Sequence, residues 1–283
     1  RKHAEKIVPT IEAVMNDFGK PDAIAVTSGP GLMTGLMVGV ETAKALSYLW
    51  KKPIIPVNHL EGHIYSPKIQ NLDQKEHIGY EFPALALIAS GGHTELILMK
   101  DHREYEQIGA TVDDAVGEAF DKVAQLLNLD YPGGPEIEQQ AKSGDPEAIS
   151  FPRPMIDSGD YDFSFSGLKT AVLYWLKDNQ VGEDESLENI CASFQQAAVD
   201  VLKRKVKQAI EEYDPNTVLL TGGVSANQLL RDSFSRKNYD IYFPLKKYCM
   251  DNATMIGIAG YYQHQSEEPP AWQQVQADPN LSL

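Results

Sequence analysis

The strongest constraint on the fold is the alternation of short strand-like runs with helix-length segments along the chain. Long periodic patterns at 187–213 and 252–262 predict helices. Residues 85–89 and 95–99 flank a turn that contains Gly91 and Gly92, which predicts an antiparallel hairpin within an otherwise helix-linked chain. The sequence therefore predicts an α/β protein with mixed sheets. The expected strands are 23–27, 54–57, 85–89, 95–99 and 218–221.

The two ends of the chain give different expectations. Apolar residues recur at spacings of three and four in the opening segment, which predicts an amphipathic helix that ends at Gly19. Its stripe of Ile7, Ile11, Met15 and Phe18 either lies wholly in the core or stays partly exposed and forms a docking surface for a partner. Residues 267–283 are polar and contain Pro, so we expect a loose tail there.

Composition excludes several classes of protein. The net charge of −15 is unfavourable for a protein that binds nucleic acid without help, so an RNA substrate requires a partner or a local basic patch. The two cysteines, Cys191 and Cys249, lie far apart in the sequence, which argues against a disulfide framework and favours a reducing compartment. No apolar run approaches the roughly 18 residues that a membrane span needs. We therefore expect a cytoplasmic protein that makes no use of a membrane.

A pair of histidines follows one of the predicted strands directly. His59 and His63 are four residues apart after the run at 54–57, so they share one face of a helix at a spacing typical of metal ligands. The carboxyl ends of strands in α/β sheets are also where ligands gather. Surface or helix-capping histidines are the alternative interpretation. A zinc peptidase motif would place a glutamate one residue after the first histidine, but Glu61 follows His59 by two.

Carboxylates provide further candidate ligands. Asp251 could supply a third hard ligand, or it could simply cap the helix that begins beside it. Asp114, Glu118 and Asp121 are spaced three and four apart on one helical stripe. That stripe is either a solvated face or an acidic edge beside the core.

Four glycine-bearing turns are more informative together than singly. Each alone is most simply a tight turn, but glycine also lets backbone N–H groups approach a phosphate or ribose. The turn at 221–223 leads toward Asn227 as a strand–loop–helix transition suited to a nucleotide. We expect Asp121 and Asn227 to lie on exposed helix or loop edges. The turns are Ser28-Gly29-Pro30-Gly31, Ser90-Gly91-Gly92-His93, Tyr131-Pro132-Gly133-Gly134-Pro135 and Thr221-Gly222-Gly223-Val224.

These motifs, in this order, resemble the tRNA threonylcarbamoyl-adenosine transferase family, called TsaD in bacteria and formerly described as an O-sialoglycoprotein endopeptidase. The likeness covers nearly the whole chain and is closer to the bacterial and organellar branch than to the archaeal one. Besides the four turns it includes Asn58 to His63, Gly117-Glu118-Ala119-Phe120-Asp121-Lys122, Phe163-Ser164-Phe165-Ser166-Gly167-Leu168-Lys169-Thr170, Ser225-Ala226-Asn227 and Cys249 to Asn252.

The resemblance implies an actin-like architecture, the sugar-kinase and Hsp70-type ATPase fold, in which two related α/β lobes close on a nucleotide. The N-terminal lobe is expected to comprise 1–80 with 254–283, and the C-terminal lobe 81–253. Relatives begin with a strand and an acidic hairpin that this sequence does not contain. We therefore expect the N-terminal lobe of this chain to lack its first strands.

The resemblance also implies the ligands. It places one divalent metal ion per subunit, iron or zinc, on His59, His63 and Asp251. It assigns no catalytic base: the proton of the attacking amine goes either to a protein group or to solvent. The implied substrate contacts are Ile88, Ala89, Ser90, Gly91, Gly92, Asp121, Gly134, Glu138 and Asn227.

The implied activity is transfer of the threonylcarbamoyl group from threonylcarbamoyl-AMP to the exocyclic amine of adenosine at position 37 of tRNAs that read codons starting with adenosine. The implied protein partners are a paralogous dimer partner of the TsaB type and a small ATPase of the TsaE type. A non-catalytic, actin-like nucleotide-binding partner subunit is an alternative, although that paralogue lacks the paired histidines. A metallopeptidase is a further alternative, which the position of Glu61 disfavours.

Overall fold

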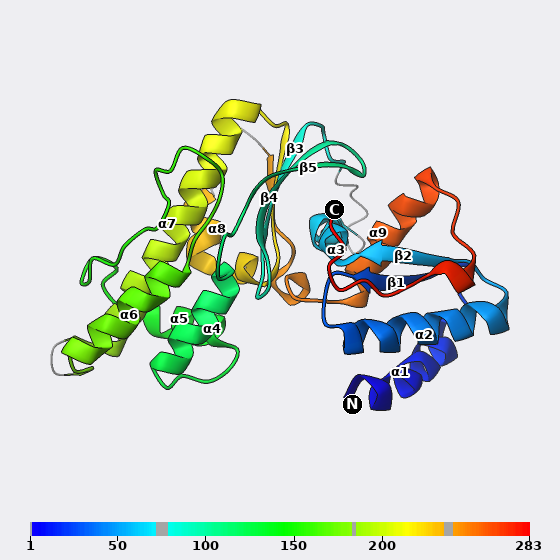
Figure 1. Cartoon of the computed structure of the whole chain (residues 1–283), viewed down its shortest axis with the longest axis horizontal. Coiled ribbons are helices and arrows are strands. Elements are labelled where there is room, and N and C mark those ends of the chain that lie inside the picture. Colours follow the sequence, from blue (N-terminus) through cyan, green and yellow to red (C-terminus); the bar gives the residue numbers. More distant parts are fainter. Residues whose placement is uncertain (1, 72–78, 183–184, 235–239) are drawn as a thin grey trace. The chain divides into compact units, whose positions relative to one another are not determined.

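A computed structural model of the chain describes residues 2–71, 79–182, 185–234 and 240–283, and it divides into two compact units (Figure 1). The first unit is Arg1–Ile69 with Asn252–Leu283, and the second is Gln70–Asp251. The sequence placed the corresponding divisions at 80/81 and 253/254. Each unit contains a sheet with helices packed on it, which confirms the predicted α/β class.

The first unit is built on two parallel strands. Strands β1 (Ile24–Gly29) and β2 (Ile54–Asn58) pair in register with Ile24 opposite Ile54, and helix α2 (Met33–Trp50) connects them. Apolar side chains of α2, among them Val40, pack against Ile54 to form a small core. The other elements are the helices α1 (Lys2–Phe18), α3 (His59–Tyr65) and α9 (Ala253–Ser266), and the 3₁₀ turns η1 (Ser66–Asn71) and η4 (Trp272–Gln274).

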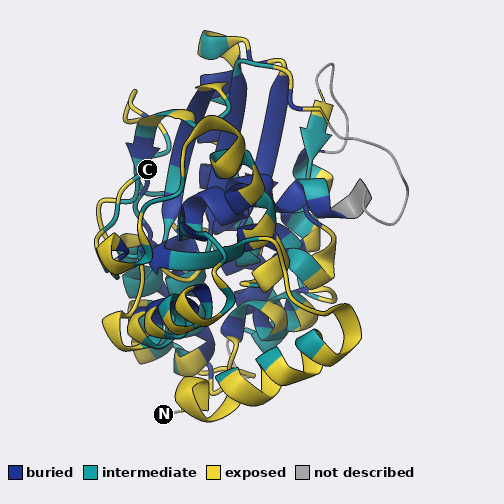
Figure 2. Cartoon of the chain, turned by 90° about the vertical axis from the view of Figure 1, so that its right-hand side faces the viewer, coloured by how far each residue is buried: buried dark blue, intermediate teal, exposed yellow. Residues whose placement is uncertain are grey.

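Helix α1 contacts its own unit only lightly. None of its described residues is buried, and Figure 2 shows the helix beside the N-terminus as largely exposed. Ile7, Ile11 and Met15 are half-buried, while the side chain of Phe18 is 83% exposed. The stripe is therefore partly exposed, so the wholly buried interpretation is wrong, and its use as a docking surface stays a prediction.

The C-terminal segment is not a loose tail, so that prediction was wrong. The backbone N–H of Asp278 donates to the carbonyl oxygen of Ser28 at 2.7 Å, and the side-chain Nδ2 of Asn58 donates to the carbonyl oxygen of Ser282 at 2.9 Å. Val275 is 2% exposed and joins the core beside Ile54. A few apolar side chains and backbone hydrogen bonds thus fix a segment whose overall composition is polar.

The second unit contains a five-stranded mixed sheet in the order β5-β4-β3-β6-β7. The predicted hairpin is confirmed: β3 (Ala84–Ala89) and β4 (Thr94–Asp101) are antiparallel, with Ala89 opposite Thr94. Strand β3 also pairs in parallel with β6 (Thr217–Thr221). Two further strands, β5 (Glu104–Ala110) and β7 (Asp240–Tyr242), lie at the edges and were not predicted.

Helices pack on this sheet through one large apolar core (Figure 1). Long helix α7 (Leu187–Tyr213) has the bounds that its apolar periodicity predicted, and it begins at Ser186, whose hydroxyl accepts from the N–H of Asn189. Side chains such as Phe194 and Leu220 are completely buried in this core. The remaining elements are α4 (Val116–Leu126), α5 (Gly133–Ala141), α6 (Ser166–Asp178), α8 (Gln228–Phe234), and the 3₁₀ turns η2 (Gly223–Ala226) and η3 (Lys246–Tyr248).

The carboxylate of Asp113 fixes the start of α6. It accepts hydrogen bonds from the hydroxyls of Ser164 and Ser166, both at 2.6 Å, and from the backbone N–H groups of Phe165 and Ser166 at 2.9 and 3.2 Å. Partial burial alone would raise the pKa of the Asp113 carboxyl. The four hydrogen bonds together outweigh that effect, so its pKa lies below the usual value.

This arrangement gives a pH-dependent prediction for stability. A carboxyl whose pKa is lower in the folded chain stabilises the fold above its unfolded pKa, about 3.9, and that contribution is lost as the pH falls through the folded pKa. We expect Asp113→Asn to unfold a few degrees below the original chain at pH 7. The difference should shrink as the pH falls through the folded pKa of Asp113. Thermal unfolding across this range measures it. The exposed loop variant Asp130→Asn should unfold like the original chain, and a constant deficit for Asp113→Asn at every pH would contradict the assignment.

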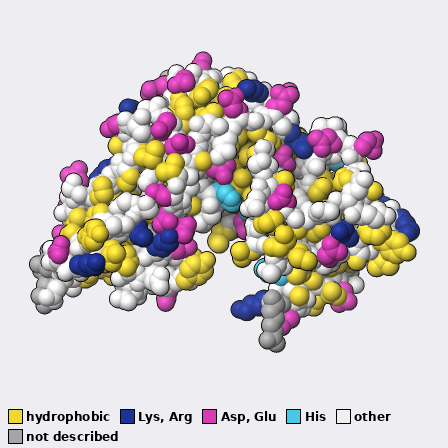
Figure 3. Space-filling model, viewed as in Figure 1, with side chains coloured by type: hydrophobic (Ala, Val, Ile, Leu, Met, Phe, Trp, Pro, Cys, Tyr) yellow, Lys and Arg dark blue, Asp and Glu magenta, His cyan; other side chains and the backbone are white. Residues whose placement is uncertain are grey.

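The surface reflects the acidic composition. On the face drawn in Figure 3, Asp and Glu side chains are spread widely, whereas Lys and Arg side chains form small separate groups. Within the ranges that the structure describes, no helix combines the length and apolar character needed to cross a bilayer.

Candidate functional site

The two histidines of the predicted metal site lie on successive turns of α3. The helix begins directly at the end of β2, where Asn58 caps it by accepting from the N–H of Leu60 at 2.8 Å. The rings of His59 and His63 stand edge to face with centroids 4.9 Å apart. His63 is 1% exposed, and the hydroxyl of Ser66 donates to its carbonyl oxygen at 2.7 Å. The strand end and both caps therefore fix the helix that carries the pair.

Close packing of α3 on α9 places the third predicted ligand beside this pair. A Cβ atom at Gly62 would lie 2.7 Å from Cδ1 of Ile256, so the glycine leaves room for the side chains of α9 at this contact. Helix α9 is capped by Asn252, whose side chain accepts from the N–H of Met255 at 2.9 Å. The cap interpretation for Asp251 was therefore wrong. Asp251 is joined to this capping residue by its own peptide bond, at the very start of the helix that packs on α3.

His59, His63 and Asp251 can together hold a metal ion. Each offers one ligand atom, and these atoms all lie within 4.8 Å of one another. Two imidazole nitrogens and a carboxylate oxygen form a donor set that suits a divalent ion such as iron or zinc. Three protein ligands also leave coordination positions for a substrate or water. The chemistry of the donor set therefore fits the metal that the resemblance implies.

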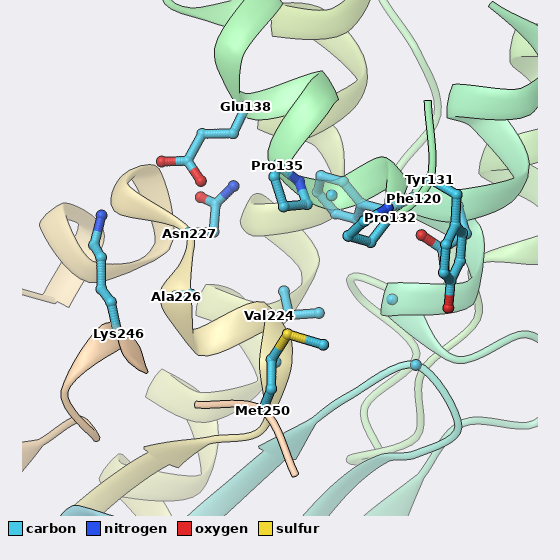
Figure 4. Close-up of a pocket in the computed structure, with 15 residues that line it drawn as sticks. Phe120, Tyr131, Pro132, Pro135, Glu138, Val224, Ala226, Asn227, Lys246 and Met250 are labelled. Atoms are coloured by element: carbon cyan, nitrogen blue, oxygen red, sulfur yellow. The ribbon is translucent and has the colours of Figure 1, made fainter. Parts of the chain in front are cut away.

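A second candidate site is a cavity of about 360 Å³ that lies wholly within the second unit (Figure 4). This volume suits a small ligand such as a nucleotide. Its lining comes from the turn after β3, the facing ends of α4 and α5, the turn after β6, and the segment around η3. The lining residues are Gly91, Gly117, Phe120, Asp121, Tyr131, Pro132, Gly134, Pro135, Glu138, Gly223, Val224, Ala226, Asn227, Lys246 and Met250.

Two acidic side chains of the cavity also hold its walls. Asp121 on α4 accepts from the backbone N–H of Gly133 at 2.8 Å, at the first residue of α5. A Cβ at Gly133 would lie 2.8 Å from Cα of Asp121, so glycine lets the two helices meet closely. Glu138, one turn further along α5, accepts from the N–H of Gln228 at 3.1 Å and so ties α5 to the start of α8. Each carboxylate retains acceptor positions for a ligand.

The turn after β6 depends on glycine and on Asn227. Gly222 has φ 84°, and a Cβ there would overlap the carbonyl oxygen of Ala89. Asn227 is only 6% exposed, which differs from the exposed loop position that we expected. Asn227 is the N-cap of α8, because its Oδ1 accepts from the N–H of Leu230 at 3.1 Å. Its Nδ2 donates to Oε1 of Gln195 at 2.7 Å. One donor and one acceptor position of the amide remain for a ligand.

The turn after β3 is held by hydrogen bonds between its own residues, and it contacts the start of α4. The N–H of Ser90 donates to the carbonyl oxygen of His93 at 2.8 Å, and the hydroxyl of Ser90 accepts from the N–H of His93 at 3.1 Å. The N–H of Gly117 donates to the carbonyl oxygen of Ser90 at 3.2 Å, and a Cβ at Gly117 would lie 2.6 Å from that oxygen. These contacts bring Gly91 to the edge of the cavity.

The structure brings together five of the nine predicted substrate residues, since Gly91, Asp121, Gly134, Glu138 and Asn227 all line the cavity. The other four do not line it. Ile88 and Ala89 are completely buried in β3, while Ser90 is half-buried and Gly92 is exposed in the turn that follows.

Sequence reasoning missed several lining residues, above all Lys246 and Met250. They follow β7, a strand of three residues that gives almost no periodic signal. The only available pointer was their position just before Asp251. Tyr131 and Pro132 belong to a glycine turn that was recognised, but their side chains were given no role.

Comparison with known protein sequences gives consistent matches. A model of the family described as tRNA N6-adenosine threonylcarbamoyltransferase, TsaD, matches residues 1–258. A protein of that name from Endomicrobium trichonymphae is 45% identical over 295 residues, which cover 100% of this chain and 84% of that protein. Another, from Staphylococcus aureus (strain bovine RF122 / ET3-1), is 46% identical over 274 residues, 94% of this chain and 78% of that protein.

Solved structures resemble this chain in fold. Full-length HypF, crystallised in a phosphate- and nucleotide-bound form, superimposes with a TM-score of 0.63 at 16% identity, covering 92% of this chain and 41% of HypF. HypF of T. kodakarensis gives a TM-score of 0.63 at 13% identity, with 92% and 43% covered. At these identities the likeness shows the fold alone.

Proposed function

This chain belongs to the tRNA N6-adenosine threonylcarbamoyltransferase family, and we propose that it transfers the threonylcarbamoyl group from threonylcarbamoyl-AMP to the exocyclic amine of adenosine at position 37 of tRNAs that read codons starting with adenosine. Membership confirms the family and the transferase class that the ordered motifs predicted. The observation that supports the proposed site is the cavity in the second unit, because its lining includes five of the expected substrate contacts, which come from separate segments of the chain.

The donor is already activated, so the protein mainly has to orient it and stabilise the departing phosphate. The amine nitrogen of adenosine attacks the carbonyl carbon of the threonylcarbamoyl group and forms a C–N bond. The bond between that carbon and the phosphate oxygen breaks, and AMP leaves with the electron pair. The amine proton passes to solvent after attack. This route needs no protein base.

The residues of the cavity take distinct roles in this proposal. Asp121, Glu138 and Asn227 bind the ribose and base of the donor through the acceptor and donor positions that their structural hydrogen bonds leave available. The N–H of Ser90 is used inside its own turn, so the acyl end is assigned to the amides of Gly91 and Gly92. These groups are fixed before the donor binds, which reduces the cost of ordering them.

We propose that His59, His63 and Asp251 hold one divalent metal ion per subunit, iron or zinc. Such an ion would supply a Lewis acid and a template for donor oxygens. His59 and His63 lie on the helix that begins at the end of β2, and Asp251 directly precedes Asn252, the N-cap of α9.

The net charge of the chain predicts how it binds tRNA with and without partner proteins. At −15, the chain alone should bind tRNA weakly, because neutralisation of phosphates by Lys and Arg supplies most non-specific affinity. We propose that a paralogous TsaB-type partner and a TsaE-type ATPase complete the active assembly in the cytoplasm. The stripe Ile7, Ile11, Met15 and Phe18 of α1 is the surface proposed for docking, since Phe18 is largely exposed.

A gel-shift titration with tRNA tests this. We expect little shift with the chain alone in about 0.15 M salt and a clear shift when the partners are added. Phe18→Asp should weaken the effect of the partners, whereas Asp17→Ala, beside it on the same helix, should not. Tight, salt-sensitive binding by the chain alone would show that a local basic patch suffices.

The transfer itself is tested by mass analysis of nucleosides. The chain, its partners, threonylcarbamoyl-AMP and unmodified tRNA are incubated together, and the tRNA is then digested. Formation of threonylcarbamoyladenosine only when the chain is present supports the proposal. Equal formation without the chain overturns it.

A further inference from the structure

Three polar side chains of the cavity gather at one end. Figure 4 shows the head groups of Glu138, Asn227 and Lys246 on the same side, with the carboxylate of Glu138 directed toward the other two. Phe120, Tyr131 and Pro132 lie at the opposite end, and Met250 lies beside Val224 between them. A ligand in this cavity therefore meets Glu138, Asn227 and Lys246 at one end. At the other end it meets ring surfaces, where the carboxylate of Asp121 is bonded to the N–H of Gly133.

Lys246 is held at this end through its backbone. It belongs to the turn η3, and the guanidinium of Arg231 fixes the segment that leads into that turn. Arg231 Nη2 donates to the carbonyl oxygen of Pro244 at 2.6 Å, and its Nε donates to the carbonyl oxygen of Ser225 at 2.7 Å. The same guanidinium lies 4.8 Å from the ring centroid of Phe243. These contacts connect the Lys246 segment to the glycine turn that lines the cavity.

Charge distinguishes Lys246 from the rest of the lining. Among the described lining residues it is the only Lys or Arg, and it shares the cavity with two carboxylates, Asp121 and Glu138. An ammonium group only donates hydrogen bonds, and an ionised carboxylate only accepts them. A ligand edge that carries a donor next to an acceptor satisfies both Glu138 and Lys246. A bare phosphate would bring its negative charge against Glu138.

Adenine has such an edge. Its exocyclic N6 amine is a donor, and the adjacent ring nitrogens are acceptors. Guanine presents the acceptor O6 where adenine has N6. Because the backbone fixes the order of Glu138 and Lys246, guanine in the same pose would place O6 against the carboxylate.

We propose that Lys246 is a specificity-determining residue that donates to N1 of adenine, the ring nitrogen that carries a hydrogen in guanine, while Glu138 accepts from the N6 amine, so that the cavity selects adenine nucleotides over guanine nucleotides. This inference rests on the proposed function, which places the adenylate donor in this cavity. It adds a residue and a base preference that the family's ordered motifs did not indicate.

The test compares AMP and GMP binding to the full chain by calorimetric titration. The variants are Lys246→Met, which keeps an unbranched side chain of nearly the same length but removes the charge, and Lys247→Met. Lys247 is a matched control, since it is the neighbouring exposed lysine, does not line the cavity, and lies over the ring of Tyr248 at 4.8 Å. Both positions are exposed, and thermal unfolding checks that each variant remains folded.

We expect Lys246→Met to weaken AMP binding by about tenfold, the usual effect of losing a hydrogen bond from a charged group, and to reduce the preference for AMP over GMP by a similar factor. Lys247→Met should leave both affinities unchanged. The affinity for 2′-deoxy-AMP should fall by the same factor as that for AMP. A loss confined to AMP would assign Lys246 to the ribose hydroxyl and overturn the inference.

The possible failures are distinguishable. If AMP binds the original chain and Lys246→Met leaves the AMP-to-GMP ratio unchanged, the base preference is overturned while the nucleotide site stands. If the original chain binds neither nucleotide in the presence of its partners, both the inference and the proposed nucleotide site are overturned.

Discussion

An Asp251→Ala variant is expected to purify with less than about a tenth of the metal bound by the original chain and to lose threonylcarbamoyl transfer by more than about a hundredfold. Loss of even an outer-shell partner costs ten- to a hundredfold in affinity or activity at metal sites, and removal of one of three protein ligands has a larger effect. His59→Ala should behave in the same way, because its ring nitrogen belongs to the same group of ligand atoms within 4.8 Å.

Both substitutions lie outside the apolar core, since Asp251 is exposed and His59 is half-buried, so the variants should remain folded. Elemental analysis and a transfer assay on the same preparations provide the measurement. His264→Ala, an exposed histidine on α9, and Asp17→Ala, at the end of α1, are the matched controls and should keep both metal and activity. Full metal content in Asp251→Ala and His59→Ala would place the metal elsewhere.

The second large effect is expected for Asn227→Ala, which should lower the free energy of unfolding by about 2–4 kcal/mol and weaken AMP binding. Loss of the N-cap of α8 accounts for about 1 kcal/mol. Gln195, which is 7% exposed, then loses the donor to its Oε1, and a buried unsatisfied polar group costs about 1–3 kcal/mol. The effect on binding follows because Asn227 and the turn before it line the cavity.

Asn227→Asp separates the two contributions. Its carboxylate can still accept from the N–H of Leu230, and a negative charge at a helix N-terminus is favourable. The amide of Gln195 can rotate so that it donates to the new carboxylate. Urea unfolding should therefore show a smaller loss for Asp than for Ala. If Asn227→Ala is as stable as the original chain, the buried hydrogen bonds contribute nothing and the account of this wall is wrong.

Strong local patterns predicted much of the fold. The bounds of α7 follow from a long apolar periodicity and the cap at Ser186, and the β3–β4 hairpin follows from two apolar runs around a double glycine. Strand β5 was missed because it is an edge strand whose residues are mostly exposed and polar. Strand β7 is too short to give a pattern. The ordering of 267–283 depends on a few contacts, such as that of Val275, which polar composition conceals.

The sequence predicted the parts of the site that lie within one local motif. It did not predict the parts that depend on contacts between distant segments of the chain. The spacing of His59 and His63 already indicated a shared helix face. The burial of Asn227 could not be inferred, because its partner Gln195 lies 32 residues away on another helix. The segment of Lys246 is connected to the glycine turn through Arg231, whose guanidinium donates to Pro244 and Ser225. Contacts of this kind have no signature in the sequence of either partner.

The central claim is that this chain transfers an acyl group from an adenylate to tRNA, and a single-turnover experiment with labelled donor tests it most directly. Threonylcarbamoyl-AMP with an isotopic label in its threonyl part is mixed with the chain, its partners and unmodified tRNA. Labelled nucleoside and released AMP are then counted in the same sample. The account predicts one labelled adenosine derivative for each AMP released, and no label in the tRNA when the chain is left out. Release of AMP while the tRNA stays unlabelled would show a hydrolase instead and would contradict it.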